Sequence, residues 1–311
     1  MLLNKEKNFI SAVIYVYNQE MFILPFLEQL NACLNERFEK YEVICVNDAS
    51  TDRSVCEIKA FAAAHPECMV SLLHMSFYQG LELSMNAGVD LAIGDFVFEF
   101  DSPQISCPIT LIQDIYFHSL KGFDIVSAVP KEQNHRCSSL FYAVFNRAAK
   151  TQHLLYTEAF RILSRRAINR VHSMSVMIPY RKAVYANCGL NMDALFFDGK
   201  QEMQRTERKI RRSQKETAVD ALVMYTDLAY RCSMLFSMLM MAIVFGGGFY
   251  TVYIYFSGKP VAGWTTTMLF LAAGFLGLFG LMTIVIKYVS IILKLDFNRQ
   301  KYMIESIEKI K

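Results

Sequence analysis

The stretch "DFVFEFDSPQ", residues 95–104, is a short apolar run that ends in Asp101 and then meets a serine and a proline. Aromatic and β-branched residues in such a run, bounded by turn-forming residues, predict a buried β-strand. The same apolar character occurs earlier in "FISAVIYVYNQE" (9–20), "YEVICVNDAS" (41–50) and "MVSLLHM" (69–75). We therefore expect a series of buried strands in this part of the chain.

The segments between these strands have apolar residues at helical spacing. This spacing predicts helices over 21–36, 53–64 and 81–92. Strands that alternate with helices form a mostly parallel sheet covered on both faces, so the expected fold class is α/β and Rossmann-like. Ligands bind at the carboxyl ends of the strands in such sheets, which makes "YNQE", "NDASTD" and "DSPQ" the candidate site.

The bulk composition limits the classes of partner. The net charge of +3 is small, and no segment interleaves aromatic and basic residues, so we expect no nucleic-acid partner. The eight cysteines are scattered without a CxxC pair, which indicates reduced core thiols. The N-terminal sequence "MLLNKEKNF" places charges where a secretory signal needs an apolar run, so we expect the front of the chain to stay in the cytoplasm.

Two long apolar runs lie near the C-terminus. Residues 234–256 and 264–286 contain no charged side chain. As helices, each run would span about 34 Å, which is enough for a hydrocarbon core of roughly 30 Å. The sequence therefore predicts two transmembrane helices, and the alternative is a pair of buried helices in a large soluble core.

Basic residues flank the two runs at their outer ends. Six lie between residues 205 and 215 and four between 287 and 301, whereas the connection holds only Lys259. Because an excess of Lys and Arg marks cytoplasmic loops, we expect a multi-pass protein of the cytoplasmic (inner) membrane with both termini inside. The segment 205–215 would also attract an anionic leaflet.

Four motifs, in this order and spacing, carry a resemblance to a known family: "YVYNQE", "YEVICVNDASTD", "NAGVDLAIGDFVFEFD" and "EAFRILSRRAINRV". They resemble the inverting nucleotide-sugar glycosyltransferases of the GT-A fold. The branch that looks most similar is the polyprenyl-phosphate glycosyltransferases, the relatives of dolichol-phosphate mannose synthase and of the bactoprenol glucosyltransferases. The likeness covers nearly the whole chain, and the tail "KYVSIILKLDFNRQKYMIESI" is similar to the segment that follows the second membrane helix of bacterial members.

The resemblance implies a membrane glycosyltransferase of cell-envelope glycan biosynthesis. Such an enzyme moves one hexose from a UDP- or GDP-sugar to a polyprenyl phosphate, of undecaprenyl or dolichyl type, at the cytoplasmic leaflet with inversion. The implied partners are the nucleotide sugar, the lipid acceptor and the membrane. A homo-oligomer is neither implied nor excluded.

The resemblance also assigns residues to the donor. Tyr17 and Asn18 match the motif that lines the nucleotide pocket, and Asp48 matches the aspartate that contacts the base. Asp101 matches the first aspartate of the DxD motif, which engages Mg²⁺ or Mn²⁺ and the donor diphosphate. Asp101 is therefore the expected metal ligand and a catalytic residue.

A second set of residues is implied at the acceptor phosphate. The segment "FRILSR" matches the family segment near that phosphate, with Arg161 as a catalytic residue and Ser164 and Arg165 as ligands. Lys131 and Arg136 fall where this branch carries basic residues. The alternative is that residues 161–170 form an amphipathic helix with a solvated basic face.

Four departures from the family pattern favour an alternative function. They are Gln19, Asn47, Pro103 and Ala159, each at a position where the family commonly has an acidic residue. Pro103 replaces the second aspartate of the DxD motif, and losing one carboxylate weakens a site for a hard cation. The alternative is a catalytically weak or inactive relative that binds a nucleotide or a membrane partner, with Asp101 as a strand-end cap.

The expected chemistry needs no general base. A phosphate monoester is already anionic near neutral pH and can attack the anomeric carbon directly. The acceptor therefore needs cations that bind it, which Arg and Lys side chains supply.

These features divide the chain into four parts. We expect a GT-A domain over 1–200, a basic amphipathic juxtamembrane segment over 201–233, two transmembrane helices with a short outer hairpin over 234–286, and a cytoplasmic tail over 287–311.

Overall fold

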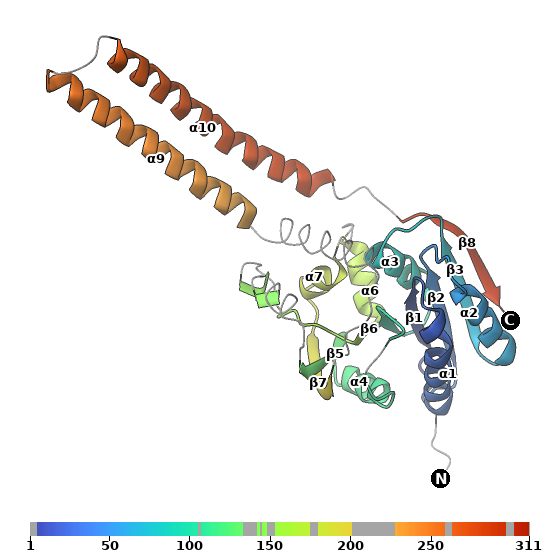
Figure 1. The fold of residues 1–311 in the computed structure, drawn as a ribbon. Helices are drawn as coiled ribbons and strands as arrows, with labels where there is room; N and C mark the ends of the chain where they lie inside the picture. Colours follow the sequence, from blue (N-terminus) through green and yellow to red (C-terminus); the bar gives the residue numbers. More distant parts are fainter. Residues whose placement is uncertain are drawn as a thin grey trace. The chain divides into compact units, whose positions relative to one another are not determined.

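The computed structural model describes most of the chain as two compact units. The described residues are 5–104, 107–132, 142–143, 145–147, 153–174, 180–200, 228–258, 263–296 and 302–310. One unit, the α/β unit, holds the described residues up to 200 together with 302–310, and the other, the helical hairpin, holds those from 228 to 296 (Figure 1).

The α/β unit is built on one eight-stranded sheet with the order β7-β5-β6-β4-β1-β2-β3-β8. Only β6 and β8 run antiparallel to their neighbours among these strands, so the expected mostly parallel α/β fold is confirmed. The strands are β1 (Ile10–Val16), β2 (Tyr41–Asn47), β3 (Met69–Met75), β4 (Phe96–Phe100), β5 (Ile125–Glu132), β6 (Phe160–Ser164), β7 (Met192–Lys200) and β8 (Ile304–Ile310).

Helices cover both faces of this sheet (Figure 1). They are α1 (Glu20–Arg37), α2 (Ser54–Ala64), α3 (Leu81–Leu91), α4 (Leu111–Ser119), α6 (Arg165–Ser173) and α7 (Arg181–Ala186). The large hydrophobic core lies under α1, α2 and α4. Side chains alternate along a strand, so Phe98 and Phe100 enter this core while Glu99 points to the opposite face.

On that opposite face, α3 packs closely against the sheet. A Cβ on Gly88 would lie 2.4 Å from Val13 Cγ1 and 2.6 Å from Val46 Cγ2. Because only glycine fits this approach, α3 can lie directly on β1 and β2. The same helix carries Glu82, which takes part in the site described below.

Four strands, β5 to β8, were not named from the sequence, and two of them differ from what was expected there. The segment 161–170, considered above as one amphipathic helix, is divided into β6 and the start of α6, which begins at Arg165. The tail forms β8, which pairs antiparallel with β3 and closes that edge of the sheet. β8 places the end of the chain in the same sheet as its beginning.

The helical hairpin consists of α9 (Leu228–Phe256) and α10 (Trp264–Asp296). The two helices lie side by side, and Ser237 Oγ donates to the carbonyl oxygen of Phe279 over 3.0 Å and lies 2.7 Å from Thr283 Oγ1. Small polar side chains of this kind join helices in lipid.

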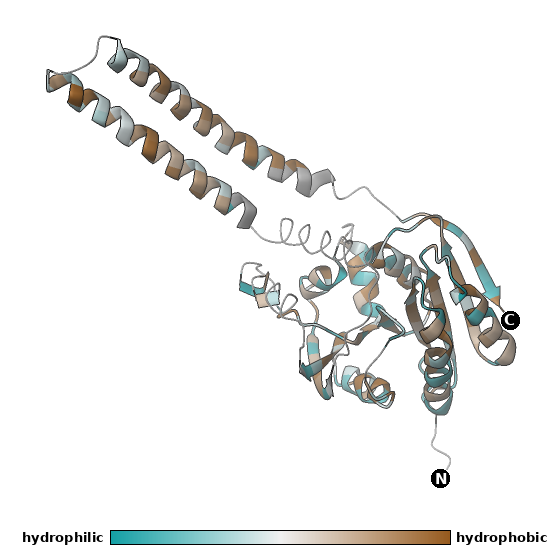
Figure 2. Cartoon of the chain, viewed as in Figure 1, coloured by the Kyte–Doolittle hydropathy of each residue, from teal (hydrophilic) through white to brown (hydrophobic). Residues whose placement is uncertain are grey.

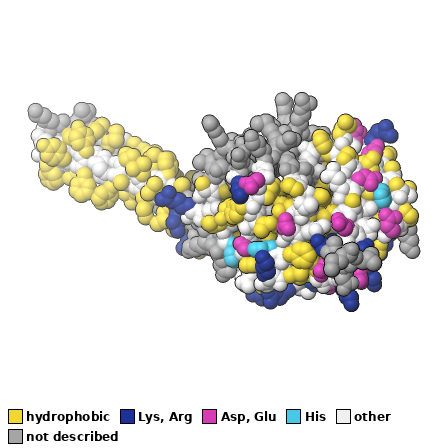
Figure 3. Space-filling view, turned by 90° about the horizontal axis from the view of Figure 1, so that it is seen from below, with side chains coloured by type: hydrophobic (Ala, Val, Ile, Leu, Met, Phe, Trp, Pro, Cys, Tyr) yellow, Lys and Arg dark blue, Asp and Glu magenta, His cyan; other side chains and the backbone are white. Residues whose placement is uncertain are grey.

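Most described side chains of the hairpin are apolar and exposed (Figures 2 and 3). The ranges Arg231–Phe256 and Trp264–Val289 are each long and apolar enough to cross a membrane. Almost none of these residues is buried, which argues against a pair of core helices in a soluble protein. Two candidate membrane spans therefore lie where the uncharged runs predict them.

Candidate active site

The loops at the carboxyl ends of β1, β2 and β4 are joined by polar contacts. Asn18 Oδ1 accepts a hydrogen bond from the Thr51 backbone N–H over 2.9 Å. Gln104 Nε2 donates to Gln19 Oε1 over 2.7 Å. The polar strand ends named from the sequence thus meet at one edge of the sheet, as expected for parallel neighbours.

Asp48 follows β2 and is fully buried beside the end of β3. Its carboxylate accepts from the backbone N–H groups of Gln79 (2.7 Å) and Gly80 (2.8 Å) and from the Tyr15 hydroxyl (2.9 Å). Burial raises the pKa of this carboxyl, and the hydrogen bonds that it accepts oppose the rise. Both oxygens of Asp48 therefore hold the loop after β3, and its contact with a base stays a prediction.

The loop that Asp48 holds also carries an aromatic partner of Tyr17. The rings of Tyr17 and Tyr78 lie 4.7 Å apart between centroids at an interplanar angle of 60°. Asn18 has a positive φ of 50°, in the left-handed region that asparagine tolerates. Tyr17 and Asn18 thus lie at the strand-end edge, where a nucleotide pocket is predicted.

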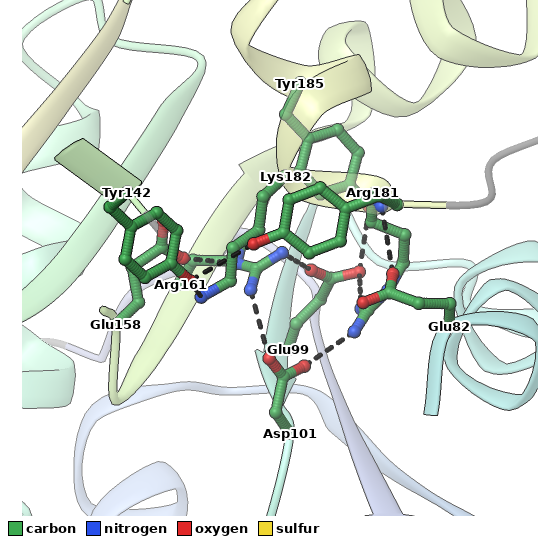
Figure 4. A network of polar contacts seen from close by, with 10 residues as sticks. Glu82, Glu99, Asp101, Tyr142, Glu158, Arg161, Arg181, Lys182 and Tyr185 are labelled. Carbon is green, nitrogen blue, oxygen red and sulfur yellow. Dashed lines mark hydrogen bonds and ion pairs between the residues drawn. The ribbon is translucent and has the colours of Figure 1, made fainter. Parts of the chain in front are cut away.

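Asp101 lies one residue beyond the end of β4 and contacts two guanidinium groups (Figure 4). Arg181 Nη2 donates to Asp101 Oδ1 over 2.7 Å, and Arg161 Nη2 donates to Asp101 Oδ2 over 3.2 Å. Arg161 and Arg181 are almost completely buried, with 2% and 1% of their side chains exposed, while Asp101 is 25% exposed. Asp101 is thus the solvent-facing member of a buried ion-pair network.

Glu99, one pleat deeper on the same strand, shares both arginines with Asp101. Arg161 is its cross-strand neighbour in β6, and Nη1 of Arg161 lies 3.1 Å from Glu99 Oε2. Arg181 Nη1 donates to Glu99 Oε1 over 2.8 Å, and the Tyr185 hydroxyl donates to the same oxygen over 2.9 Å. The two strand acids and the two guanidiniums form a closed four-residue ring.

Two further acids hold the outer sides of the arginines (Figure 4). Glu82 Oε2 accepts from both the backbone N–H and Nε of Arg181, at 2.9 and 3.0 Å. Glu158 Oε2 lies 2.8 Å from Arg161 Nε. Lys182 follows Arg181, and its Nζ donates to the Tyr142 hydroxyl over 3.4 Å.

The arginines set the charge state of this network. Burial alone would raise the pKa of Asp101, but Arg181 and Arg161 outweigh it and hold the pKa well below its usual range. Burial alone would lower the pKa of Arg181, and Glu99, Asp101 and Glu82 raise it instead. Both groups are charged at neutral pH.

Ser164 and Arg165, predicted to bind the acceptor phosphate, make contacts within the protein scaffold. Ser164 Oγ caps α6 by accepting from the Ala167 N–H over 3.1 Å and donates to Asp124 over 2.8 Å. Arg165 donates to the backbone carbonyl oxygens of Ala92 and Gly94. These contacts draw Arg165 away from Asp101, and the phosphate-binding roles of Ser164 and Arg165 stay predictions.

The remaining predicted acceptor residues are Lys131 and Arg136. Lys131 is 55% exposed and pairs with Asp198 over 2.9 Å, so its charge is available at the surface. Arg136 lies outside the described residues.

The described residues do not assemble a full set of protein ligands for a divalent metal. Mg²⁺ and Mn²⁺ prefer several oxygen ligands, whereas both oxygens of Asp101 accept from guanidiniums and position 103 is a proline. In the part of the chain that the structure describes, no group of three His, Cys, Asp or Glu side chains is arranged to hold a metal.

Sequence reasoning missed Arg181, Glu82, Lys182 and the part played by Glu99. A signal for Glu99 was present, because a lone acid within "FVFEF" must find a partner when the strand is buried. No spacing rule links it to Arg181, which lies 82 positions away.

The family model of glycosyl transferase family 2 matches residues 11–171. This range is more than half of the chain, and it contains Asp48, Asp101 and Arg161. The chain belongs to glycosyl transferase family 2.

The chain is also similar to several curated proteins. The chain is 25% identical over 201 residues to the uncharacterized glycosyltransferase sll0501 of Synechocystis, covering 63% of this chain and 62% of that protein. It is 20% identical over 263 residues to the uncharacterized glycosyltransferase YkcC of Bacillus subtilis, covering 82% and 80%. It is 27% identical over 200 residues to the undecaprenyl-phosphate 4-deoxy-4-formamido-L-arabinose transferase of Pectobacterium atrosepticum, covering 60% and 59%. The resemblance to the polyprenyl-phosphate branch is thereby confirmed.

Solved structures show the same fold. The mannosyltransferase PcManGT of Pyrobaculum calidifontis, in complex with GDP-Man and Mn²⁺, is 16% identical with a TM-score of 0.50, covering 73% of this chain and 65% of that chain. Glucosyl-3-phosphoglycerate synthase of Mycobacterium tuberculosis, in complex with phosphoglyceric acid, is 12% identical with a TM-score of 0.50, covering 70% and 78%. At these identities the likeness concerns the GT-A fold.

Proposed function

We propose that this protein is a membrane glycosyltransferase that moves a single hexose from a UDP- or GDP-sugar to a polyprenyl phosphate at the cytoplasmic leaflet, with inversion. Membership of glycosyl transferase family 2 and a relative named as an undecaprenyl-phosphate transferase support the reaction class. Two candidate membrane spans support a lipid-borne acceptor.

The observation that carries the proposal is the guanidinium network at the carboxyl end of β4. Arg161 and Arg181 place two guanidiniums, each held by three carboxylates, at the edge where donors bind in parallel sheets. Positive charge in a site shielded from water stabilises the negative charge that develops on a leaving diphosphate. Asp101 holds the two guanidiniums in place.

The proposed reaction needs no proton transfer. An oxygen of the lipid phosphate attacks the anomeric carbon, the bond from that carbon to the donor diphosphate breaks, and the electron pair leaves with the nucleoside diphosphate. Arg161 lies in the network and Lys182 lies beside it. Their positive charges would offset the negative charges of the donor diphosphate and of the acceptor phosphate. Lys131, at the surface, would guide the acceptor.

The proposed topology has both termini in the cytoplasm. The basic residues that flank the two spans support this orientation, because Lys and Arg are retained on the cytoplasmic side. The juxtamembrane segment 201–233 lies mostly outside the described residues, so its amphipathic helix along the membrane surface stays a prediction.

Label transfer tests the function. The full chain in detergent is incubated with undecaprenyl phosphate and a panel of labelled donors that includes UDP- and GDP-hexoses and a formamido-arabinose donor. We expect lipid-extractable label from one donor, with the activity lost in Arg161→Met and kept in Lys59→Gln, a change on the exposed side of α2. The proposal fails if folded protein transfers no sugar from any donor.

A second candidate is a catalytically weak relative that binds a nucleotide. Pro103 and the complete pairing of Asp101 favour it. Calorimetry with UDP and GDP discriminates the two, because this candidate gives nucleotide binding without transfer.

A further inference from the structure

The carboxylate of Asp101 already has a cationic partner at each oxygen. We propose that this protein binds its nucleotide-sugar donor without a divalent metal, with Arg161 and Arg181 filling the place beside Asp101 that a metal would take. This inference rests on the proposed function, because it concerns the donor site of that reaction.

The geometry at Asp101 places a guanidinium against each carboxylate oxygen. A divalent cation bound by a carboxylate lies about 2.0–2.6 Å from its oxygens. Here Oδ1 and Oδ2 accept from Arg181 and Arg161 at 2.7 and 3.2 Å. A guanidinium does not lose its proton in a protein, so it cannot become neutral to make room for a metal. A metal that reached the remaining lone pairs of Asp101 from its exposed side would lie directly beside two guanidiniums, which repel it.

Neither arginine is free to move away from Asp101. Arg181 bridges Asp101, Glu99 and Glu82, and Arg161 bridges Asp101, Glu99 and Glu158. Moving either side chain breaks three ion pairs and leaves buried carboxylates without a counter-charge, which is strongly unfavourable.

The charges at the end of β4 are already paired with one another. Glu82, Glu99, Asp101 and Glu158 surround the two guanidiniums, so each arginine contacts three carboxylates before any ligand binds. Lys182 adds a further positive field at Asp101. A divalent cation bound to Asp101 would therefore lie beside the guanidiniums of Arg161 and Arg181, within the short range of their contacts with that carboxylate.

The loop after Asp101 lacks a second acid. Position 103, where the family commonly has a second acid, is a proline without a side-chain oxygen. Its polar neighbours already make contacts: Ser102 Oγ accepts from the Gln104 N–H over 3.1 Å, and the Gln104 amide donates to Gln19. The described part of the loop therefore supplies no replacement ligand.

Metal binding is measured directly on the unmodified protein. The full chain in detergent is titrated with Mn²⁺, and free Mn²⁺ is followed by electron paramagnetic resonance, with and without UDP or GDP. We expect no stoichiometric Mn²⁺ bound by the protein beyond what the nucleotide alone binds. One tightly held Mn²⁺ per chain would overturn the inference.

Nucleotide binding gives the second readout. Calorimetric titration with UDP and GDP is done once with EDTA and once with excess Mn²⁺. We expect the two dissociation constants of the bound nucleotide to agree within about twofold, a difference well under one tenfold step in affinity. Nucleotide binding that appears only with Mn²⁺ overturns the inference and leaves the proposed function standing. If the protein binds no nucleotide and transfers no sugar, the proposed function itself is contradicted.

Pro103→Asp supplies a sharper test. If an attenuated metal site were present, the second carboxylate would restore Mn²⁺-dependent binding. We expect no such restoration, because Asp101 stays paired with both arginines. A matched variant, Ser102→Asp, places the same charge one position earlier, and a Mn²⁺ response in Pro103→Asp alone would contradict the inference.

Discussion

Gln79 and Met303 exchange two hydrogen bonds across the sheet edge. The Met303 N–H donates to Gln79 Oε1 over 2.8 Å, and Gln79 Nε2 donates to the Met303 carbonyl oxygen over 2.6 Å. The backbone N–H of Gln79 donates in turn to Asp48. The residue that precedes β8 therefore braces the loop after β3, which carries Tyr78 and donates to Asp48 at the predicted nucleotide pocket.

Gln79→Ala tests this brace. The variant loses two hydrogen bonds, each worth about 0.5–1.5 kcal/mol, and frees the loop after β3. We expect UDP or GDP to bind roughly 5–50-fold more weakly by calorimetry, since each factor of ten is about 1.4 kcal/mol. Lys59→Gln is the control, because it breaks only the exposed ion pair that Lys59 of α2 makes with Glu308 of β8. Equal loss in both variants would show that β8 as a whole, not Gln79, sets the affinity.

Glu99→Gln tests the buried ring. The change keeps the volume of the side chain and removes the carboxylate with which both Arg161 and Arg181 pair. Breaking a buried ion pair by removing one partner costs about 3–5 kcal/mol, so we expect a large drop in Tm of the α/β unit. Glu308→Gln, which removes an exposed acid, should lower the Tm far less. Near-ultraviolet circular dichroism of the tyrosines is the suitable probe, because the single tryptophan, Trp264, lies in α10.

Lys131→Gln tests the acceptor route. Lys131 is exposed and its partner Asp198 is more exposed still, so the change should leave stability within about 0.5 kcal/mol. We expect KM for the polyprenyl phosphate to rise roughly 3–10-fold while kcat stays constant, since a surface cation contributes about 1 kcal/mol of attraction to an anionic lipid. A change confined to kcat would contradict a guiding role.

The carboxyl of Asp124 predicts how stability depends on pH. Burial alone would raise its pKa, but hydrogen bonds from Arg166 and Ser164 lower it below the ordinary value of Asp. An acid whose pKa is lowered by folding stabilises the fold fully above its unfolded pKa, which is about 3.9, and loses that contribution as the pH falls further. The difference in Tm between the wild type and Asp124→Asn should therefore be largest near neutral pH and shrink below about pH 4. A difference that is constant with pH would assign the effect to packing.

The order of the elements up to β4 was predictable, because alternating buried strands and amphipathic helices leave a strong periodic pattern. The strand β6 was not, since "FRILS" is short and its arginine breaks the apolar run. β8 was also missed: "IESIEKI" alternates apolar and charged residues as an edge strand does, but its partner β3 lies more than 200 positions earlier.

The candidate site was predictable only where it is local in sequence. Asp101, Asp48 and Tyr17 follow strands and could be placed at one edge of the sheet from the pattern alone. Arg181 could not, because its three acidic partners come from α3 and from the end of β4, and no local pattern specifies such a meeting. Arg165 belongs to the predicted motif, yet its contacts with two carbonyl oxygens depend on the turn before β4.

The return of the chain through β8 bears on how a water-soluble fragment should be made. A fragment that stops at residue 200 would lose its last strand and leave the backbone groups of β3 unpaired, and open sheet edges promote aggregation. Joining residue 200 to residue 302 by a flexible peptide would restore that edge while omitting both apolar helices. A single proteolytic cut between 201 and 227 would likewise leave the sheet joined to the helical hairpin, because β8 stays covalently attached to α10.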